Sequence, residues 1–268
     1  MFTDIHCHPY DLARLFPENE EERRSLNVLT AASACSPDEF FYSEKLSSNA
    51  ASNNAAQVFP CYGIHPQQLI NKNSKSLLET LYKYVQEEKV FAIGECGFDL
   101  YENKYRQTEK IQEYFFDAQM EIALKFDLPV ILHVRRAMHK IFSLTKKLSK
   151  CKAVIFHSWS GTYEEGLSLM RRGVNALFSF GNTIMLRHKK AIKSCALFPA
   201  ERILTETDSP YQPRYNEKFS SWRDLSLILE TSANLRTGAG NAVSSKELET
   251  QIENNFRKIF MGTSKNSF

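Results

Sequence analysis

The sequence contains 268 residues, of which 43% are apolar, 24% are charged and 12% are aromatic. These proportions allow a sizeable core and exclude an intrinsically disordered chain, while only 10 Gly and 9 Pro exclude collagen-like and low-complexity proteins. The 34 Lys and Arg against 31 Asp and Glu give a net charge of +3, too small to indicate a protein that coats nucleic acid and no obstacle to a nucleic-acid substrate.

Short apolar or β-branched runs alternate along the chain with longer segments of helical period. Several runs are continuously apolar, which is typical of strands buried on both faces of a parallel sheet. They predict eight strands, at 2–6, 27–32, 57–62, 90–94, 129–133, 153–157, 174–180 and 202–206.

The segments between these runs predict helices. The clearest is 107–126, whose buried face is expected to carry Ile111, Phe115, Ala118, Ile122 and Phe126. Others are expected at 75–88, 137–148 and 162–172. Two polar stretches, 18–56 and 236–248, are interpreted as loops or surface helices rather than domain linkers.

Eight strands that alternate with helices predict the α/β class and a (β/α)8 TIM barrel. Such a barrel needs roughly 250 residues, so we expect residues 1–268 to form one domain. The polar C-terminal tail, 262–268, is expected to fray.

The six cysteines are scattered and contain no CxxC pair, so we expect free, buried or semi-buried thiols in a reducing compartment. The N-terminal segment lacks a basic region and carries Asp4 where a signal peptide is apolar. No apolar run approaches the roughly 18 residues of a membrane span. These features predict a cytoplasmic protein without a membrane segment.

Residues that can bind metal follow or end several predicted strands. His6 and His8 lie two positions apart in an extended chain, so their side chains project to the same side. The carboxyl ends of the strands in a barrel meet at one face, where barrel enzymes hold their active sites. The six candidates at this face are His6, His8, Glu95, His133, His157 and Asp208.

Each candidate also has a simpler interpretation. The HxH pair of His6 and His8 can arise by chance. Glu95 can instead place a negative charge at a helix N-terminus. A buried histidine can simply form a hydrogen bond with a backbone carbonyl. All six at the same end of parallel strands would require many independent coincidences, which favours the metal site. By contrast, His139 and His188 lie in helical segments beside lysines, and we interpret both as solvated.

Six ligands exceed the needs of one tetrahedral ion and suit two ions that share a carboxylate, about 3.5–4 Å apart. We expect Glu95 to bridge them, because its strand lies between the two groups. One ion would take His6, His8 and Asp208, and the other His133 and His157. Nitrogen and oxygen ligands without thiolate permit Zn, Mn, Mg or Ni.

Six sequence blocks match one family in order. They are DIHCH (4–8), YGIHP (62–66), AIGECGFD (92–99), LPVILHVRRA (128–137), FHSWSG (156–161) and LTETDSPY (204–211). On these blocks the chain resembles the TatD family of metal-dependent deoxyribonucleases, within the amidohydrolase-like barrel superfamily. The resemblance implies a (β/α)8 barrel, a divalent-metal site, hydrolysis of phosphodiesters or phosphoesters, and the ligand roles given above.

Two blocks depart from the family pattern. The usual HSRDA becomes HVRRA at 133–137, and the usual HCFSG becomes HSWSG at 157–161. Neither departure changes a ligand, but both line the expected mouth of the site, so the substrate preference stays open. Residues 10–56 show no match that we can place.

The predicted mechanism is in-line attack on phosphorus by a hydroxide activated by two metals. The catalytic residues would be Asp208, which orients or deprotonates the water, and Glu95. His65 either contacts a substrate phosphate or orders its loop. Arg135 either binds phosphate through two hydrogen bonds or forms a surface ion pair.

Neighbouring polar residues have open roles. Asp99 is expected to hold a ligand or loop rather than to bind metal. Glu206 either supports Asp208 or caps the following turn. Trp159 either stacks on a base or plugs the top of the barrel. Two basic runs are interpreted mainly as solvated helix faces, Lys146, Lys147, Lys150 and Lys152 in one and Arg187, Lys189, Lys190 and Lys193 in the other.

Three functions are therefore compared. The first is a metal-dependent phosphodiesterase that acts on DNA. The second is a hydrolase on the same scaffold that acts on a small ester, amide or phosphoester. The third is a non-catalytic binding protein that a metal stabilises.

Overall fold

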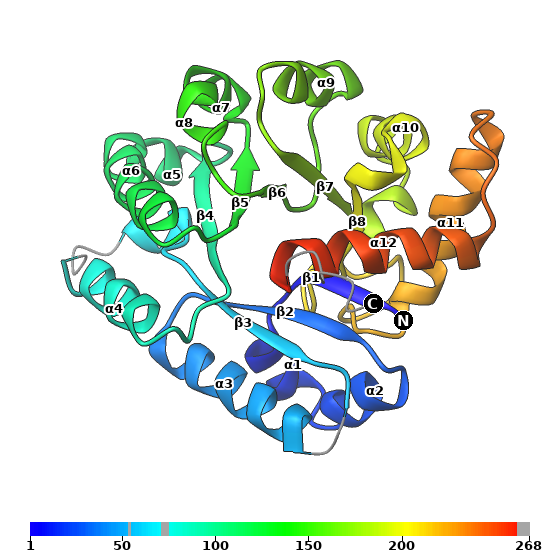
Figure 1. Cartoon of the computed structure of the whole chain (residues 1–268), viewed down its shortest axis with the longest axis horizontal. Helices are drawn as coiled ribbons and strands as arrows, with labels where there is room; N and C mark the ends of the chain where they lie inside the picture. Colours follow the sequence, from blue (N-terminus) through cyan, green and yellow to red (C-terminus); the bar gives the residue numbers. More distant parts are fainter. Residues whose placement is uncertain (53–54, 71–74, 262–268) are drawn as a thin grey trace, which may run out of the picture.

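The computed structural model describes residues 1–52, 55–70 and 75–261, and its strands form a nearly closed barrel with helices around it (Figure 1). Every strand runs parallel to the next, in the order β1 to β8. The predicted (β/α)8 barrel and its eight strands are confirmed. The strands are β1 (Thr3–Cys7), β2 (Leu29–Ala34), β3 (Val58–Tyr62), β4 (Ala92–Asp99), β5 (Val130–Arg135), β6 (Val154–Phe156), β7 (Ala176–Phe180) and β8 (Ile203–Thr205).

Side chains and loops join the last strand to the first. The Thr205 hydroxyl donates to the Thr3 carbonyl oxygen at 2.7 Å. Beyond the strand ends, the Asp208 N–H donates to the His6 carbonyl oxygen at 2.9 Å, and the His8 N–H donates to the Ser209 carbonyl oxygen at 2.7 Å. These bonds hold the segment after β8 against the end of β1.

Helices follow the strands and surround them. They are α1 (Pro9–Leu15), α2 (Asn19–Ser25), α3 (Pro37–Ser52), α4 (Lys75–Gln86), α5 (Asn103–Arg106), α6 (Glu109–Lys125), α7 (Met138–Ser143), α8 (Thr145–Leu148), α9 (Tyr163–Arg171), α10 (Lys189–Leu197), α11 (Asp224–Gly238) and α12 (Ser245–Phe260), with 3-10 turns η1 (Pro66–Ile70), η2 (Asn182–Ile184) and η3 (Ala200–Arg202). The single helix predicted at 137–148 is two helices, α7 and α8.

None of the described helices has the length and apolar character needed to cross a membrane. The tail at 262–268 lies outside the described residues.

The barrel interior is apolar and closed at its amino end. Every strand contributes to one buried cluster, which includes Ile5, Phe59 and Ile155. Phe256 and Ile259 of α12 belong to the same cluster, so α12 covers the amino end of the barrel, across which it runs in Figure 1. The site must therefore open at the carboxyl ends of the strands. All six cysteines are free and buried, as predicted.

Helix α6 buries Phe115 and Ile122 as predicted, but the start of the predicted face is wrong and two glutamines are buried instead. Ile111 is 44% exposed, whereas Gln112 and Gln119 are buried. The Gln112 side chain accepts from the Asp99 N–H at 2.9 Å, and that of Gln119 accepts from the Ile64 N–H at 2.7 Å. The apolar pattern did not predict these two buried glutamines. Their side-chain amides pair with backbone N–H groups near the site, which an apolar side chain cannot do.

The fourth strand also differs from its prediction. The sequence predicts a strand at 90–94 with Glu95 at its end. Instead β4 continues to Asp99, and its register against β5 shifts between Ile93 and Cys96, where β4 holds one extra residue. A bulge changes the side to which the following side chains point. Glu95 and Asp99 both reach the residues at the barrel mouth as a result.

A close backbone approach makes Gly97 in this strand a sensitive position. Its φ is +137°, and an added Cβ would collide with the carbonyl oxygen of His133 on β5. We expect Gly97→Ala to lower the free energy of unfolding by about 2 kcal/mol or more, measured by urea denaturation. Gly240→Ala is the matched control, because Gly240 has a φ of +85° but no neighbour within 4 Å of an added Cβ. Equal losses in the two variants would contradict the role of the collision.

Candidate metal centre and active site

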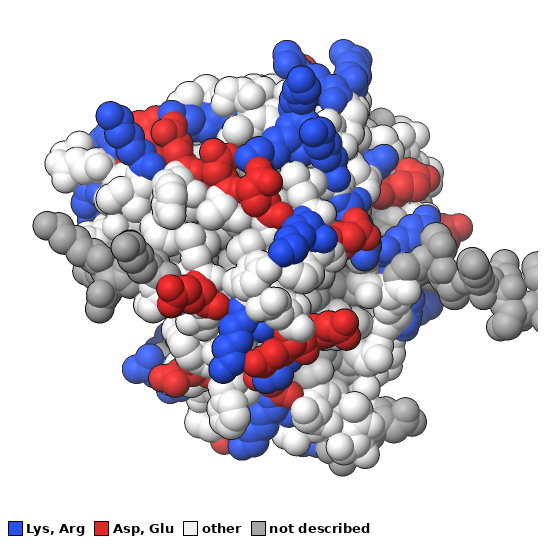
Figure 2. All heavy atoms as spheres, turned by 60° about the vertical axis from the view of Figure 1, so that its left-hand side comes forward, with Lys and Arg blue, Asp and Glu red and all other residues white. Residues whose placement is uncertain are grey.

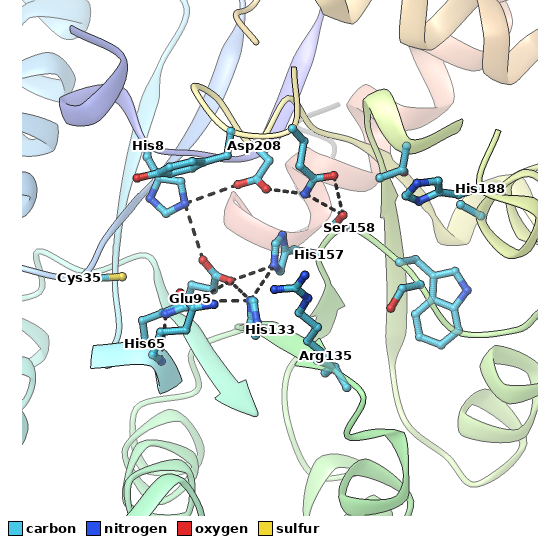
Figure 3. Close-up of a pocket in the computed structure, with 18 of the residues that line it drawn as sticks. His8, Cys35, His65, Glu95, His133, Arg135, His157, Ser158, His188 and Asp208 are labelled. Carbon is cyan, nitrogen blue, oxygen red and sulfur yellow. Dashed lines mark hydrogen bonds and ion pairs between the residues drawn. The ribbon is translucent and has the colours of Figure 1, made fainter. Parts of the chain in front are cut away.

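A cavity of about 1040 Å³ opens at the carboxyl ends of the strands (Figure 3). Five of the six predicted ligands line it, and the sixth, His6, is fully buried beneath them. The side chains come from β1, β4 and β5 and from the segments that directly follow β1, β6 and β8, which are distant in sequence. The barrel thus brings all six predicted ligands together.

The carboxylate of Glu95 is the centre of this cluster. Its Oε1 lies 2.5 Å from His133 Nδ1, 2.9 Å from His157 Nε2 and 3.1 Å from His65 Nε2. Figure 3 shows the rings of His65, His133 and His157 around this carboxylate. His65 therefore lies among the candidate ligands, whereas the sequence predicted a substrate contact or a loop-ordering residue.

The other oxygen of Glu95 faces the histidines of the first block. Oε2 lies 3.2 Å from His6 Nε2 and 3.7 Å from His8 Nε2. Asp208 approaches the same two rings, with its Oδ1 at 3.5 Å and 3.6 Å from the two Nε2 atoms. One carboxylate therefore touches both groups of histidines, which is the geometry that a bridging ligand requires.

Three overlapping sets of side chains place one donor atom each within 4.8 Å of the others. Two of the sets contain Glu95, in agreement with its central place. The sets are His6, His8 and Asp208; His6, Glu95 and His157; and His65, Glu95 and His133.

Buried polar groups orient the ring of His6. Its Nδ1 makes a 2.9 Å hydrogen bond with the hydroxyl of Ser33, which directs Nε2 toward Glu95 and Asp208. The Asp4 carboxylate accepts from both the N–H and the hydroxyl of Thr207, at 3.0 Å and 2.6 Å. Ser33 and Thr207 were missed by sequence reasoning, because a hydroxyl at the end of a strand carries no distinctive local signal.

His157 and His133, the second group of histidines, each lie near a further carboxylate. Glu206 accepts from the Ser179 hydroxyl at 2.5 Å and lies 3.8 Å from His157 Nδ1. Neither role predicted for Glu206, support of Asp208 or a turn cap, describes these contacts. Asp99 lies 3.3 Å from His133 Nε2 and accepts from Gln67 Nε2 at 2.7 Å, so it holds both a candidate ligand and a loop.

The central carboxylate of the cluster is ionised, and His6 beside it is neutral. Burial alone would raise the pKa of Glu95, but the surrounding imidazoles hold it well below its usual value, so the carboxylate is ionised. Burial lowers the pKa of His6 to about 4, so this ring is neutral near pH 7. Its Nε2 is buried without a hydrogen-bond partner. A neutral imidazole nitrogen without a partner beside two carboxylates matches the donors that divalent transition metals take.

Cationic side chains stand at the mouth of the cavity. Arg135 is 46% exposed and lies 4.0 Å from Asp99, with its guanidinium 3.9 Å from the ring centre of Tyr101. Lys189 and Lys190, at the start of α10, also line the cavity and are exposed. Within the described parts of the chain, neither lysine has an acidic partner within 4.0 Å. The predicted solvated state of His188 agrees with its exposure.

Trp159 plugs the barrel top, which was one of its two predicted roles. It is 2% exposed, its Nε1 donates to the Ser194 hydroxyl at 3.1 Å, and its ring packs 4.6 Å from that of Phe178. The exposed aromatic residue at the mouth is instead Tyr211, which is 50% exposed and donates to Asp11 at 2.8 Å.

The outer helices carry charges of both signs. Figure 2 shows the side of the molecule that includes α4 and α6, where acidic and basic side chains are interspersed. Lys147 of the first basic run pairs with Asp117 and Glu121, each at 2.9 Å. This run is therefore a solvated, ion-paired helix face, as predicted, and the second run differs from it in reaching the cavity through Lys189 and Lys190.

Comparisons with known proteins agree across the chain. Residues 3–261 match the family model described as TatD related DNase. The 3'-5' ssDNA/RNA exonuclease TatD of Pantoea ananatis is 33% identical over 206 residues, covering 74% of this chain and 76% of the relative. An uncharacterized metal-dependent hydrolase of Mycoplasma pneumoniae is 27% identical and covers 97% of this chain and 99% of its own. The crystal structure of YJJV, a TatD homologue from Escherichia coli, matches with a TM-score of 0.80 at 27% identity, covering 97% and 98% of the two chains.

Proposed function

The chain belongs to the family of TatD-related DNases and is a metal-dependent hydrolase, and we propose that it cleaves phosphodiester bonds in single-stranded nucleic acid. The observation that carries the proposal is the central carboxylate of Glu95, which contacts both groups of histidines. The relative from Pantoea ananatis is named for exonuclease action on single-stranded DNA and RNA, and this supports the substrate class.

We propose two divalent cations in the cluster. His6, His8 and Asp208 would hold one. His133 and His157, which both contact Glu95 Oε1, would hold the other, with Glu95 shared between the two. His65 lies close enough to Glu95 to complete the second set. Zn, Mn, Mg and Ni all accept such ligands. When bound, such cations lower the pKa of a coordinated water and offset the charge that develops on phosphoryl oxygens.

The residues around the cluster would bind and orient the substrate. Asp208 turns Oδ1 toward the cavity side of His6 and His8, where it would accept the proton of an attacking water. Arg135 presents several N–H donors at the mouth, and its contact with Tyr101 preorganises the guanidinium for a phosphate oxygen. Asp99 would keep His133 oriented through its Nε2.

The charge distribution at the mouth favours a polyanion over a small ester. Lys189 and Lys190 line the wall of α10, without acidic partners among the described residues, and Arg135 stands at the end of β5. The acidic residues of the opposite wall already accept hydrogen bonds, Asp11 from Tyr211 and Glu39 from the Cys35 N–H. A chain of phosphates can occupy the cluster and the cationic wall together, whereas a small phosphoester, the second candidate, occupies only the cluster.

We place the protein in the cytoplasm as one domain. Its six buried free thiols suit a reducing compartment. The N-terminal ammonium of Met1 forms ion pairs with Glu249 and Glu253 of α12, at 2.6 Å and 2.8 Å. Residues from both ends of the described chain are therefore in contact, as expected of one domain.

The test compares two substrates of the same purified protein. A labelled single-stranded oligonucleotide and bis(p-nitrophenyl) phosphate, which contains one diester, are incubated with Mg, Mn, Zn or Ni after removal of the purification metals. We expect shortened oligonucleotide products in at least one metal, and none with Glu95→Gln. Turnover of the small diester without any oligonucleotide cleavage would exclude the nuclease in favour of the small-ester hydrolase.

The cationic wall leads to a further prediction. We expect the double variant Lys189→Gln, Lys190→Gln to raise KM for an oligonucleotide by about ten-fold at low salt and to flatten its salt dependence by about 1.4 in logarithmic slope. KM for the small diester should stay unchanged. The double variant Lys146→Gln, Lys150→Gln removes the same charge from exposed residues away from the cavity and serves as the control. An equal effect of both double variants would show that only net charge matters.

A further inference from the structure

We propose that Gln212 is a positioning residue for the metal centre, because its side-chain amide holds Asp208 in the orientation that presents Oδ1 to His6 and His8. The inference rests on the proposed function in one respect, the role of Asp208 as a ligand. The sequence indicated nothing about Gln212, which comes four residues after Asp208 in an irregular segment.

The amide of Gln212 lies between two loops of the barrel mouth. Its Nε2 donates to Asp208 Oδ2 at 2.5 Å and to the Ser158 hydroxyl at 2.9 Å. The Ser158 hydroxyl donates in turn to Gln212 Oε1 at 3.1 Å. Figure 3 shows Asp208 and Ser158, the two partners of this amide, at the ends of a chain of dashed contacts. Both ends of the amide are therefore engaged, so its orientation is defined.

This contact divides the two oxygens of Asp208 between different partners. Oδ2 accepts from Gln212, which leaves Oδ1 directed at the Nε2 atoms of His6 and His8. The terminal torsion of an aspartate is broad, so without a partner for Oδ2 the carboxylate can rotate. A neutral amide fixes that torsion without cancelling the negative charge that a cation needs, which an arginine at this position would do.

The same amide also connects the two histidine groups. Ser158 directly follows His157, while Asp208 faces His6 and His8, so Gln212 ties the loop after β6 to the loop after β8. The backbone of Gln212 is held as well, since Asn182 Nδ2 donates to its carbonyl oxygen at 3.1 Å.

Backbone strain is present at this contact as well. Ser158, Asp208 and Gln212 have φ values of 44°, 53° and 51°, in the left-handed region that residues other than glycine rarely occupy. Each such residue costs energy and persists only where the surroundings determine it. All three line the cavity, so the strained backbone directs the amide and the carboxylate to the site rather than into the core.

The experiment measures metal binding as well as catalysis. Gln212→Leu removes the amide, and Gln212→Glu keeps its shape while replacing the donor by a second carboxylate. For the metal-free protein, we expect the dissociation constant for Mn, measured by calorimetry, to rise about ten-fold in Gln212→Leu and at least two-fold in Gln212→Glu. With bis(p-nitrophenyl) phosphate we expect kcat to fall about ten-fold or more in both variants, with KM within about two-fold of the wild type.

The control is Gln251→Leu, because Gln251 is a partly buried glutamine of α12 that donates to Asn255 at 2.8 Å, far from the cavity. It should change neither constant. An unchanged Mn affinity in both Gln212 variants, with circular dichroism like that of the wild type, would overturn the inference. A rise in KM alone would also overturn it, because it would make Gln212 a substrate contact.

The outcome for the proposed function is separate. A wild-type protein that binds Mn but cleaves neither substrate would refute the proposed function. The Mn affinities of the Gln212 variants would still decide whether Gln212 positions Asp208.

Discussion

Replacing Glu95 by glutamine is expected to lower kcat by about a thousand-fold or more and to reduce the bound metal. The loss should exceed the 10–100-fold that follows the removal of an outer partner of a metal ligand, because Glu95 is the one carboxylate among the described residues that contacts both histidine groups. The amide keeps the shape of the side chain but has neither the charge nor the second acceptor oxygen.

The substitution also removes the counter-charge of buried imidazoles. Burial lowers the pKa of His157, but in the metal-free protein the charge of Glu95 raises it to about 10, so the two form an ion pair near pH 7 until a cation displaces the proton. In Glu95→Gln we expect the pKa of His157 to fall, which NMR titration of the ring resonances would measure. The ring would then be largely neutral under conditions where the wild-type ring is charged.

The measurements for this variant are steady-state kinetics, metal analysis and circular dichroism. Glu164→Gln, which alters an exposed acidic residue paired with Lys193, is the control. A folded Glu95→Gln protein that keeps its metal and at least a tenth of wild-type kcat would refute the bridging role. If the wild type binds metal but turns over neither substrate, the result would favour the third function, a non-catalytic binding protein that a metal stabilises.

Removing divalent cations is expected to abolish turnover and to lower the melting temperature by about 5–11 °C. A ligand at one hundred times its dissociation constant stabilises the folded state by about 2.7 kcal/mol, and each kcal/mol corresponds to about 2–4 °C in a chain of this size. Without cations, His6 Nε2 has no partner and the cluster keeps two ionised carboxylates close together.

Thermal denaturation with and without chelator measures this stabilisation, and titration of Mn, Zn, Mg or Ni into the metal-free protein should restore both stability and activity. Calorimetric stoichiometry should approach two ions per chain. In Glu95→Gln the shift caused by chelator should be much smaller. Full activity in a protein shown by elemental analysis to contain no metal would contradict the whole proposal.

The amino-acid sequence by itself determined the strand order, the barrel and the membership of the family. Eight buried strands can be predicted because parallel strands covered on both faces consist of continuous apolar runs, which are local patterns. The six candidate ligands can be predicted for a related reason, since the carboxyl ends of parallel strands necessarily meet at one face. The blocks that carry them also identified the family, which the match over residues 3–261 confirms.

Only the tertiary structure decided how these residues meet. The bulge in β4 places Glu95 inside a continuous strand and turns it to the barrel axis, and a bulge depends on the register of a neighbouring strand. His65 joins the cluster through a contact that spans 30 residues, and the Gln212 amide that holds Asp208 is itself tied to Ser158 in the loop after β6. Ligand identity followed from residue type and strand position, whereas ligand orientation depends on hydrogen bonds between distant segments, which leave no local pattern in the sequence.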